Sequence, residues 1–316
     1  MIQQQISYLY SQSFQMDHSF EENVNGFESR DVILGIDEAG RGPVLGPMVY
    51  ACLFYPKENE DLLRNINIDD SKKLSAHNRV KINDKIRKLS DKFGWRIHVM
   101  SAEYLSCEMH RRKKHNLNEI SHLAAISKSK CFGCCVFILL DLIKHVISSG
   151  VNVTEVYIDT VGPPDSYKSK LLSIFPNINI TVKPKADSLY PSVSGASILA
   201  KVKRDTLLSD WRSSSAGTYN FGANRTGSCE QGSGYPGDPK TKEFLRQVFD
   251  PVFGFPNIVR FSWSTASEII DKHGYSVVWG GEETTSQQKI KLFRDNKCCK
   301  FLILQMIRLE IKRDNI

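Results

Sequence analysis

The sequence predicts an α/β protein, because short apolar strands alternate with helical stretches over most of its 316 residues. Acidic residues support this class: three strands that lie far apart in the chain end in carboxylates, at Asp37 with Glu38, at Asp159 and at Asp187. The chain is also long enough to bury a sizeable core, either as one large domain with a sub-domain or as two domains.

Composition narrows the kind of partner and the compartment. The formal net charge of +7 permits a polyanionic partner without requiring one. The eight cysteines include the neighbours Cys134 and Cys135, which cannot easily share one bridge, and this favours a reducing compartment. Residues 1–30 lack the basic start and apolar core of a secretory signal, so we expect a polar N-terminal extension there.

The strand at residues 32–36 organises the rest of the chain. Its sequence, VILGI, is apolar and rich in β-branched residues, as in a strand that is buried on both faces. Asp37 and Glu38 follow directly. Because neighbouring strand side chains point to opposite faces, both carboxylates meet one ligand only if the chain bends there. The alternative is an ordinary acidic turn that closes a strand.

A glycine-rich turn, AGRGP at residues 39–43, supplies that bend. Gly40 and Gly42 bracket Arg41, so backbone amides can approach a substrate closely with a cation beside them. The apolar run MVYACLFY at residues 48–55 then predicts a second strand that forms a hairpin with the first.

A polar loop, DDSKKL, precedes a predicted helix at about residues 75–89. Asp70 or Ser71 is suited to cap that helix, which leaves Lys72 and Lys73 to face an anion. A solvated helix start is the alternative. Residues 95–100, WRIHVM, alternate and predict another strand.

Histidines and cysteines do not form a zinc motif. The three histidines between residues 110 and 122 lack paired ligands at zinc spacing, and the Cys-x-x-Cys-Cys at residues 131–135 has no second thiol pair nearby. The basic run at residues 111–114 is suited to backbone phosphates or is a solvated face. Residues 128–142 are too short for a transmembrane helix, and a buried helix is the better interpretation.

Two further strands bring acid to their ends. Residues 153–160, VTEVYIDT, predict a strand that carries Asp159 at its end. Residues 178–183, INITVK, predict another, and Asp187 follows shortly after it. A helix at residues 192–211 comes next, and its Lys201 and Arg204 add positive charge.

The C-terminal third changes character. A Ser/Gly-rich loop ends in GSGYPGDPKTKEFL, a turn that carries Tyr235 before a helix starting near Asp238. The aromatic run PVFGFPNIVRFSWST should pack on the main domain. We therefore divide the chain into a polar extension (1–30), a catalytic domain (31–212), a Ser/Gly-rich loop (213–234), a helical sub-domain (235–282) and a basic amphipathic tail (283–316).

Four clustered carboxylates would repel one another and raise their own pKa values unless cations relieved the repulsion. Oxygen ligands of this kind suit Mg²⁺ or Mn²⁺ rather than zinc. Two such ions about 4 Å apart stabilise the attacking and leaving oxygens of an in-line phosphoryl displacement. Asp37, Glu38, Asp159 and Asp187 are therefore candidate ligands for two divalent ions, facing nucleic acid.

These motifs resemble those of a known family, the type 2 ribonucleases H, and within it the catalytic subunits of the eukaryotic trimeric enzymes. The matching blocks are long and stand in family order over most of residues 31–279. They are GIDEAGRGPVLGPMVYA, DSKKL, NLNEISH, VNVTEVYIDTVGPP, VKPKADSLYPSVSGASILAKVKRD, GSGYPGDPKTKEFL and PVFGFPNIVRFSW.

The resemblance implies an RNase H-like fold, a mixed central sheet flanked by helices, with a small helical C-terminal part. It implies that the four carboxylates bind Mg²⁺ or Mn²⁺ and that the Gly40-Arg41-Gly42 turn contacts a ribose 2′-hydroxyl while Tyr235 stacks on the neighbouring deoxyribose. Basic groups, with Lys72, Lys201 and Arg204 as candidates, would neutralise phosphates.

The resemblance also implies an activity: hydrolysis of RNA in RNA–DNA hybrids and cleavage 5′ of single ribonucleotides in duplex DNA, leaving 3′-hydroxyl and 5′-phosphate ends. It implies roles in primer removal and ribonucleotide excision, a nuclear location, and two non-catalytic partner subunits that dock on the C-terminal region.

Two regions depart from the family pattern, since residues 128–140 look like an insertion and the tail after Gly281 has no match. A non-catalytic scaffold protein that binds hybrids is one alternative, although no carboxylate is lost. A DNA strand-transfer enzyme is another, which the glycine turn and Tyr235 argue against.

Overall fold

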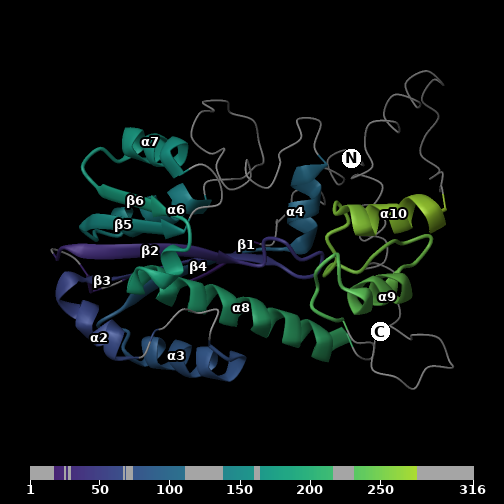
Figure 1. Ribbon diagram of the computed structural model, residues 1–316, viewed down its shortest axis with the longest axis horizontal. Helices are drawn as coiled ribbons and strands as arrows, with labels where there is room; N and C mark the ends of the chain where they lie inside the picture. Colours follow the sequence, from purple (N-terminus) through teal and green to yellow (C-terminus); the bar gives the residue numbers. More distant parts are fainter. Residues whose placement is uncertain are drawn as a thin grey trace, which may run out of the picture.

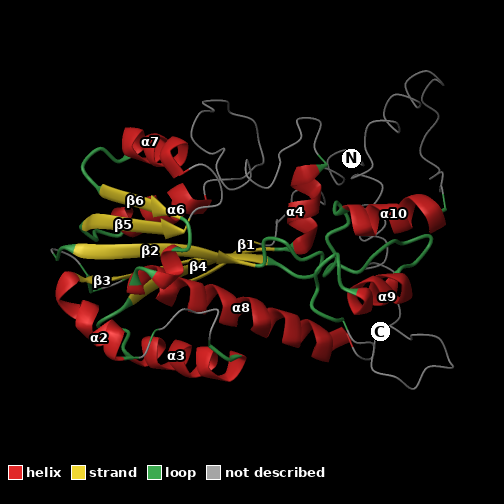
Figure 2. Ribbon diagram, viewed as in Figure 1, coloured by secondary structure: helices red, strands yellow, loops and turns green. Residues whose placement is uncertain are grey.

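The computed structural model describes residues 18–24, 26–27, 30–66, 68, 74–110, 138–159, 164–215 and 231–275. Within these ranges the chain forms a mixed sheet with helices on both faces, and a small helical sub-domain lies beyond one end of the sheet (Figure 1). Figure 2 shows the same arrangement by secondary structure. The predicted α/β class is confirmed.

The six-stranded sheet has the order β1-β4-β3-β2-β5-β6. Its strands are β1 (His18–Asn23), β2 (Val32–Ala39), β3 (Met48–Pro56), β4 (Gly94–Met100), β5 (Val153–Asp159) and β6 (Asn179–Lys183). The β1–β4, β4–β3 and β3–β2 pairs are antiparallel, whereas β2–β5 and β5–β6 are parallel. Because parallel strands end at the same edge of a sheet, β2, β5 and β6 deliver whatever follows them to one place.

Helices cover both faces of the sheet (Figure 1). One face packs against α4 (Ala102–Met109), α6 (Ile138–Ser148) and α7 (Pro164–Ile174). The other packs against α2 (Glu60–Asn65), α3 (Ala76–Lys88) and α8 (Pro191–Ser215), with the short η1 (Lys57–Asn59) leading into α2. Burial on both sides explains why β2 and β3 read as continuous apolar runs rather than as alternating ones.

Alternation along β2 assigns its side chains to these two cores. Leu34 and Ile36 belong to the core under α6, and Ile33 belongs to the core under α8. Gly35 faces the start of α8, where a Cβ atom would lie 2.2 Å from the carbonyl carbon of Ser192. Only glycine lets the helix approach the strand this closely.

A third core belongs to the sub-domain, which contains α9 (Pro239–Val248) and α10 (Ser264–His273). Phe244, Phe255 and Val259 pack there against Val44 and Leu45, which follow the glycine turn after β2. The prediction that the aromatic run of residues 251–265 packs on the main domain is confirmed.

Several predicted elements lie where we expected them, and some boundaries differ. The hairpin of β2 and β3 is confirmed, and α8 runs four residues further than the predicted end at Trp211. The expected extension at residues 1–30 contains β1, an edge strand whose pairing with β4 was not visible in its polar sequence.

The cap of α3 also differs from expectation. Ser75 accepts a hydrogen bond from the amide of Asn78 at 3.2 Å and thus caps the helix, whereas Asp70 and Ser71 lie outside the described residues. The tail (283–316) and most of the Ser/Gly-rich loop and of the apolar insertion lie outside them too. Among the described helices, none is long and apolar enough to cross a membrane.

Candidate active site

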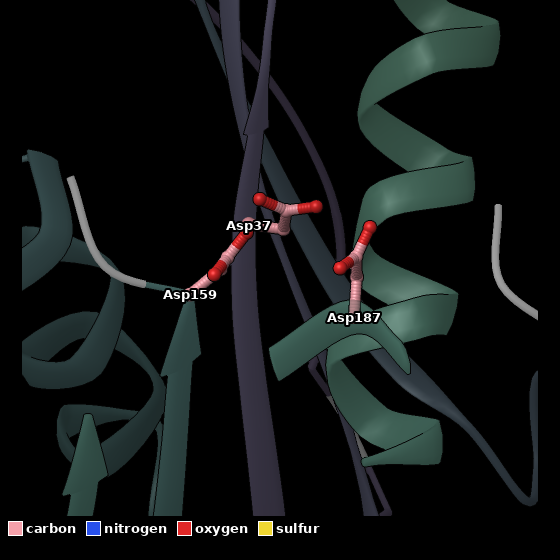
Figure 3. A group of neighbouring side chains, drawn as sticks. All are labelled: Asp37, Asp159 and Asp187. Atoms are coloured by element: carbon pink, nitrogen blue, oxygen red, sulfur yellow. The ribbon is translucent and has the colours of Figure 1, made fainter. Parts of the chain in front are cut away.

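Three aspartates from distant parts of the chain converge at the edge where the parallel strands end. Asp37 lies on β2, Asp159 is the last residue of β5, and Asp187 lies on the short helix η3 (Ala186–Ser188) after β6. Each offers a carboxylate oxygen, and these oxygens lie within 4.8 Å of one another. Figure 3 shows the three side chains pointing toward a common centre. Asp37 and Asp187 are buried, and Asp159 is partly buried.

Local backbone geometry brings the last two together. Lys183 is the register partner of Asp159 at the ends of the parallel pair β5–β6. The chain then turns at Lys185, whose backbone is left-handed (φ 58°, ψ 38°), and the amide of Ala186 donates to Asp159 Oδ1 at 3.1 Å. Asp187 follows in the next position. We expected Asp187 at a strand end, and the structure places it just beyond, on η3.

The electrostatics of this centre favour a cation. Burial raises the pKa of Asp37 to about 7, and the carboxylates of Asp159 and Asp187 add to the rise. The Ser197 hydroxyl on α8 donates a hydrogen bond to Asp37, which lowers the pKa of Asp37 and so offsets part of this rise. A divalent ion would remove the repulsion, and carboxylate oxygens are the ligands that Mg²⁺ and Mn²⁺ prefer. The described residues therefore fit a hard divalent metal.

Glu38 is not a member of this group of three, although, after burial, Asp37 and Asp159 both contribute to the raised pKa of its carboxyl group. Because β2 continues through Ala39, alternation directs Glu38 to the face opposite Asp37, and Glu38 is not one of the three converging carboxylates. Its Oε1 lies 3.8 Å from Nη1 of Arg41. Burial raises the pKa of Glu38 to about 8, with Asp37 adding to the rise and Arg41 opposing it. The bend that we expected at residues 39–43 is present, at Gly40, but β2 stays extended through Ala39, so the bend does not bring Glu38 to the side of Asp37.

The glycine turn that follows is built for close approach. Gly40 has a positive φ of 84°, and a Cβ atom there would lie 2.4 Å from Nε of Arg204 and 2.6 Å from the carbonyl oxygen of Pro47. Any other residue would clash with the backbone beneath it. The conformation and the packing together require glycine at this position.

Arg260 of the sub-domain forms hydrogen bonds with the backbone of the glycine turn and with Gly46. Its side chain is fully buried and donates to the carbonyl oxygens of Gly40 at 2.5 Å, Arg41 at 3.1 Å and Gly46 at 2.8 Å. The Trp263 ring lies 4.8 Å from its guanidinium carbon. Burial and then Arg204 lower the pKa of Arg260 to about 9, so it stays charged at neutral pH.

Tyr235 lies on the outer side of the same turn. It is 54 % exposed, and a Cβ atom on Gly42 would lie 3.1 Å from its Cε1, so its ring borders Gly42. Asp238 holds the segment in place by accepting from the Ser233 amide and hydroxyl and from the Lys240 amide. These hydrogen bonds lower the pKa of Asp238 to about 2. The structure thus places Tyr235 beside the Gly40-Arg41-Gly42 turn, and their contacts with a substrate stay a prediction.

Three residues on one side of α8 contact Asp37, the backbone after the glycine turn, and the sub-domain. Ser197, Arg204 and Trp211 recur at every seventh position, which is about two helical turns, so they share a side of the helix. Ser197 donates to Asp37, and Arg204 Nη2 donates at 3.2 Å to backbone next to the glycine turn. Trp211 Nε1 donates at 3.0 Å to Oδ1 of Asn257 in the sub-domain.

The three basic residues that we predicted to contact phosphates, Lys72, Lys201 and Arg204, have different environments. Arg204 exposes only 13 % of its side chain and lies under the turn, where it donates to the carbonyl oxygen of Leu45. It is a support for the turn rather than a surface cation, which corrects our expectation. Lys201 is partly buried on α8. Lys72 lies outside the described residues.

Sequence reasoning missed Arg260, Trp263, Ser197 and Lys185. A lone arginine in the apolar run NIVRFSW was a usable signal, since a charged residue amid such neighbours is seldom buried without partners. The others gave none: the hydrogen bond of Ser197 and the left-handed backbone of Lys185 exist only once the strands are assembled.

Comparison with known proteins identifies the family. The profile described as Ribonuclease HII matches residues 34–266, which is more than half of the chain and spans all three converging aspartates. The chain belongs to the ribonuclease HII family. Membership confirms the resemblance and the predicted enzyme class, a ribonuclease H.

Individual relatives agree with this membership. A ribonuclease H2 subunit of the rat, Rattus norvegicus, is 44% identical over 248 residues, covering 78% of this chain and 75% of its own. The crystal structure of the ribonuclease H2 from Pyrococcus horikoshii OT3 matches with a TM-score of 0.55 and 28% identity, covering 77% of this chain and 98% of that one.

A more distant structure, Bst-RNase HIII in complex with Mn²⁺, matches with a TM-score of 0.51 and 16% identity over 79% of this chain and 72% of its own. It shares the fold. The predicted RNase H-like architecture, a mixed sheet with flanking helices, is therefore confirmed.

Proposed function

We propose that this chain is a metal-dependent endoribonuclease that cuts the RNA strand of RNA–DNA hybrids and cleaves 5′ of single ribonucleotides embedded in duplex DNA. Convergence of Asp37, Asp159 and Asp187 beside the glycine turn is the observation that carries the proposal. The products would have 3′-hydroxyl and 5′-phosphate ends. Ribonuclease H activity is the property of the family, and the position of the cut is the finer part of the proposal.

The three aspartates, with Glu38 next to Asp37 in β2, would hold two Mg²⁺ or Mn²⁺ ions. When bound, such ions supply Lewis acidity at the scissile phosphate and stabilise the charge that develops on its oxygens. Asp37 and Asp187 contribute from a buried setting in which the loss of water strengthens each interaction.

Selection for a ribonucleotide would come from the glycine turn and Tyr235. Gly42 leaves room for a sugar beside the Tyr235 ring, because a Cβ atom at Gly42 would lie 3.1 Å from Cε1 of that ring. The missing Cβ atom of Gly40 instead lets the turn pack on Arg204 and Pro47. The 2′-hydroxyl is the group that separates ribose from deoxyribose at such a position. The exposed ring of Tyr235 offers an apolar face to the adjacent deoxyribose. Arg260 and Arg204 act on this step indirectly by fixing the turn.

Partners and location extend the proposal. The rat relative is named as one of the subunits of ribonuclease H2, so that protein is part of an assembly. We infer that two non-catalytic subunits dock on the C-terminal region of this chain and that the assembly works in the nucleus, in primer removal and ribonucleotide excision. Purification of the chain with and without co-expressed partners, followed by light scattering and activity assays, tests this. If the chain alone is a fully active monomer and the addition of partners does not change its activity, the proposed assembly is contradicted.

The central test is incubation of the full chain with a DNA duplex that carries one ribonucleotide, with and without Mg²⁺. We expect a Mg²⁺-dependent single cut on the 5′ side of the ribonucleotide. An all-DNA duplex of the same sequence is the control and should remain intact. Binding without cleavage in the presence of both Mg²⁺ and partners would favour the scaffold alternative, and cutting of the all-DNA duplex would contradict selection for ribose.

A further inference from the structure

Lys185 has a backbone conformation that ordinary residues avoid. It is the one non-glycine residue with positive φ in the described part of the chain, at φ 58° and ψ 38°. The left-handed region crowds the Cβ atom against the backbone, so a residue other than glycine or asparagine stays there only when its surroundings impose it. Strain of this kind tends to collect where function needs a particular geometry.

The surroundings that impose the conformation are two fixed ends. Before Lys185, β6 runs in register with β5 up to the pair Lys183 and Asp159. After it, η3 is closed by Ser188, whose amide and hydroxyl donate to the carbonyl oxygen of Lys185 at 3.1 Å and 2.8 Å. The left-handed residue joins these two ends within a very short connection.

The consequence falls on two metal-site carboxylates at once. The reversal at Lys185 directs the amide of Ala186 back onto Oδ1 of Asp159, at 3.1 Å. It also places Asp187, which is only 2 % exposed, on the first turn of η3 facing Asp37 and Asp159. The Lys185 side chain is exposed, so the backbone rather than the ammonium group makes this connection.

We propose that Lys185 is a positioning residue whose left-handed backbone sets the mutual orientation of Asp159 and Asp187 for a divalent cation. The inference rests on the metal-dependent function proposed above. What the metal site requires at position 185 is the left-handed backbone. The identity of the side chain there should therefore matter only through how well it tolerates positive φ.

Substitutions at one position separate backbone from side chain. Lys185→Gly and Lys185→Asn remove the ammonium group but accept a left-handed conformation. Lys185→Val removes the same group and disfavours that conformation strongly because it is β-branched. The matched control is Lys183→Val, the same chemical change two residues earlier in β6, where an extended backbone suits valine.

The readout is Mn²⁺ binding to the full-length chain without nucleic acid, measured by titration calorimetry, together with thermal unfolding. We expect Lys185→Val to weaken Mn²⁺ binding by roughly tenfold or more, as loss of a group that orients a metal ligand does. Lys185→Gly, Lys185→Asn and Lys183→Val should bind Mn²⁺ nearly as the wild type does. Should Lys185→Val not fold, Lys185→Ala against Lys185→Gly gives the same comparison.

Three outcomes would overturn the inference. Wild-type Mn²⁺ affinity in folded Lys185→Val would show that the conformation is not required. Equal losses in the glycine, asparagine and valine variants would assign the effect to the ammonium group. Absence of Mn²⁺ binding in the wild type would overturn the metal site itself, and this result is distinct from the other two.

Discussion

Arg260 donates from Nη2 to the carbonyl oxygen of Gly40 at 2.5 Å, although 220 positions separate the two residues. The contact joins the helical sub-domain to the turn that follows β2. Two more carbonyl oxygens of the same region accept from the same guanidinium group. The glycine turn is therefore shaped by residues of the sub-domain as well as by its own sequence.

Replacement of this arginine should damage both stability and selectivity. Arg260→Met keeps a long apolar stem but leaves one buried and two partly buried carbonyl groups without their donor, which should lower the free energy of unfolding by about 2 kcal/mol. Cleavage at an embedded ribonucleotide should fall with it, because the turn loses its support. Urea denaturation and the cleavage assay measure the two effects.

Arg246→Met, in the same sub-domain, is the matched control for that substitution. Arg246 is exposed on α9 and pairs only with Glu243 among the described residues, so its loss should change stability little. Equal stability and activity in Arg260→Met and the wild type would show that the turn keeps its shape without the sub-domain.

Removal of one converging carboxylate should abolish cleavage while hybrid binding persists. Asp37→Asn and Asp159→Asn keep the shape of each side chain but remove its charge as a metal ligand. We expect a drop in cleavage rate of at least about a hundredfold, at roughly 1.4 kcal/mol of transition-state stabilisation per tenfold. Asp210→Asn, an exposed substitution on α8, should cleave normally. Turnover like that of the wild type in Asp37→Asn would remove this carboxylate from the mechanism.

Metal-free protein should lose stability as the pH rises. The folded-state pKa values of Asp37 and Glu38 are about 7 and about 8, against ordinary values of 3.8 and 4.5. Between about pH 4 and pH 8 the folded state therefore holds protons that the unfolded state has released, and the free energy of unfolding falls across this window. Above it, the difference stays constant.

Chemical denaturation in the presence of a chelator at several pH values measures this dependence. Asp37→Asn should flatten the curve, since an amide cannot ionise, and added Mg²⁺ should restore stability most strongly at the alkaline end, where no proton competes with the ion. A wild-type curve with no steeper fall than that of Asp37→Asn would contradict the assignment.

Packing of α8 on β2 should not tolerate a single added methyl group. In Gly35→Ala the new Cβ atom would lie 2.2 Å from the carbonyl carbon of Ser192 and 2.5 Å from the amide nitrogen of Val193, both of which are helix backbone. The helix must shift, at a cost of about 1–3 kcal/mol or more. Gly237→Ala, which meets no heavy atom within 4 Å, is the control, and thermal unfolding is the measurement. Equal melting temperatures would show that α8 moves freely.

The sequence was sufficient for the features that local pattern encodes. The runs around Asp37 and Asp159 predicted strands that end in acid, because apolar β-branched residues and their turn residues are neighbours in the chain. Parallel pairing then brings those ends together, as the structure confirms for Asp37, Asp159 and Asp187. The metal itself and the roles of these residues in catalysis stay predictions.

Features that depend on assembly were not predictable in the same way. Arg204 looked like a surface cation on a basic helix, yet the turn around Gly40 covers it. The polar sequence of β1 showed no strand pattern. In the folded chain Glu21 pairs with Arg87 and Glu22 pairs with Arg96, and these salt bridges hold the two glutamates in place. Such pairings join residues more than sixty positions apart.

The contacts of Ser197, Arg204 and Trp211 fix the spacing and the rotation of residues along α8. Each residue of an α-helix advances the chain by about 1.5 Å and rotates it by about 100°. One residue inserted between Ser197 and Arg204 would turn every later side chain away from its partner, however well that residue suited a helix. Substitutions along the exposed side of α8 are compatible with the site, whereas a change in the number of residues is not. The spacing within this helix is thus a stricter requirement than most of its side chains.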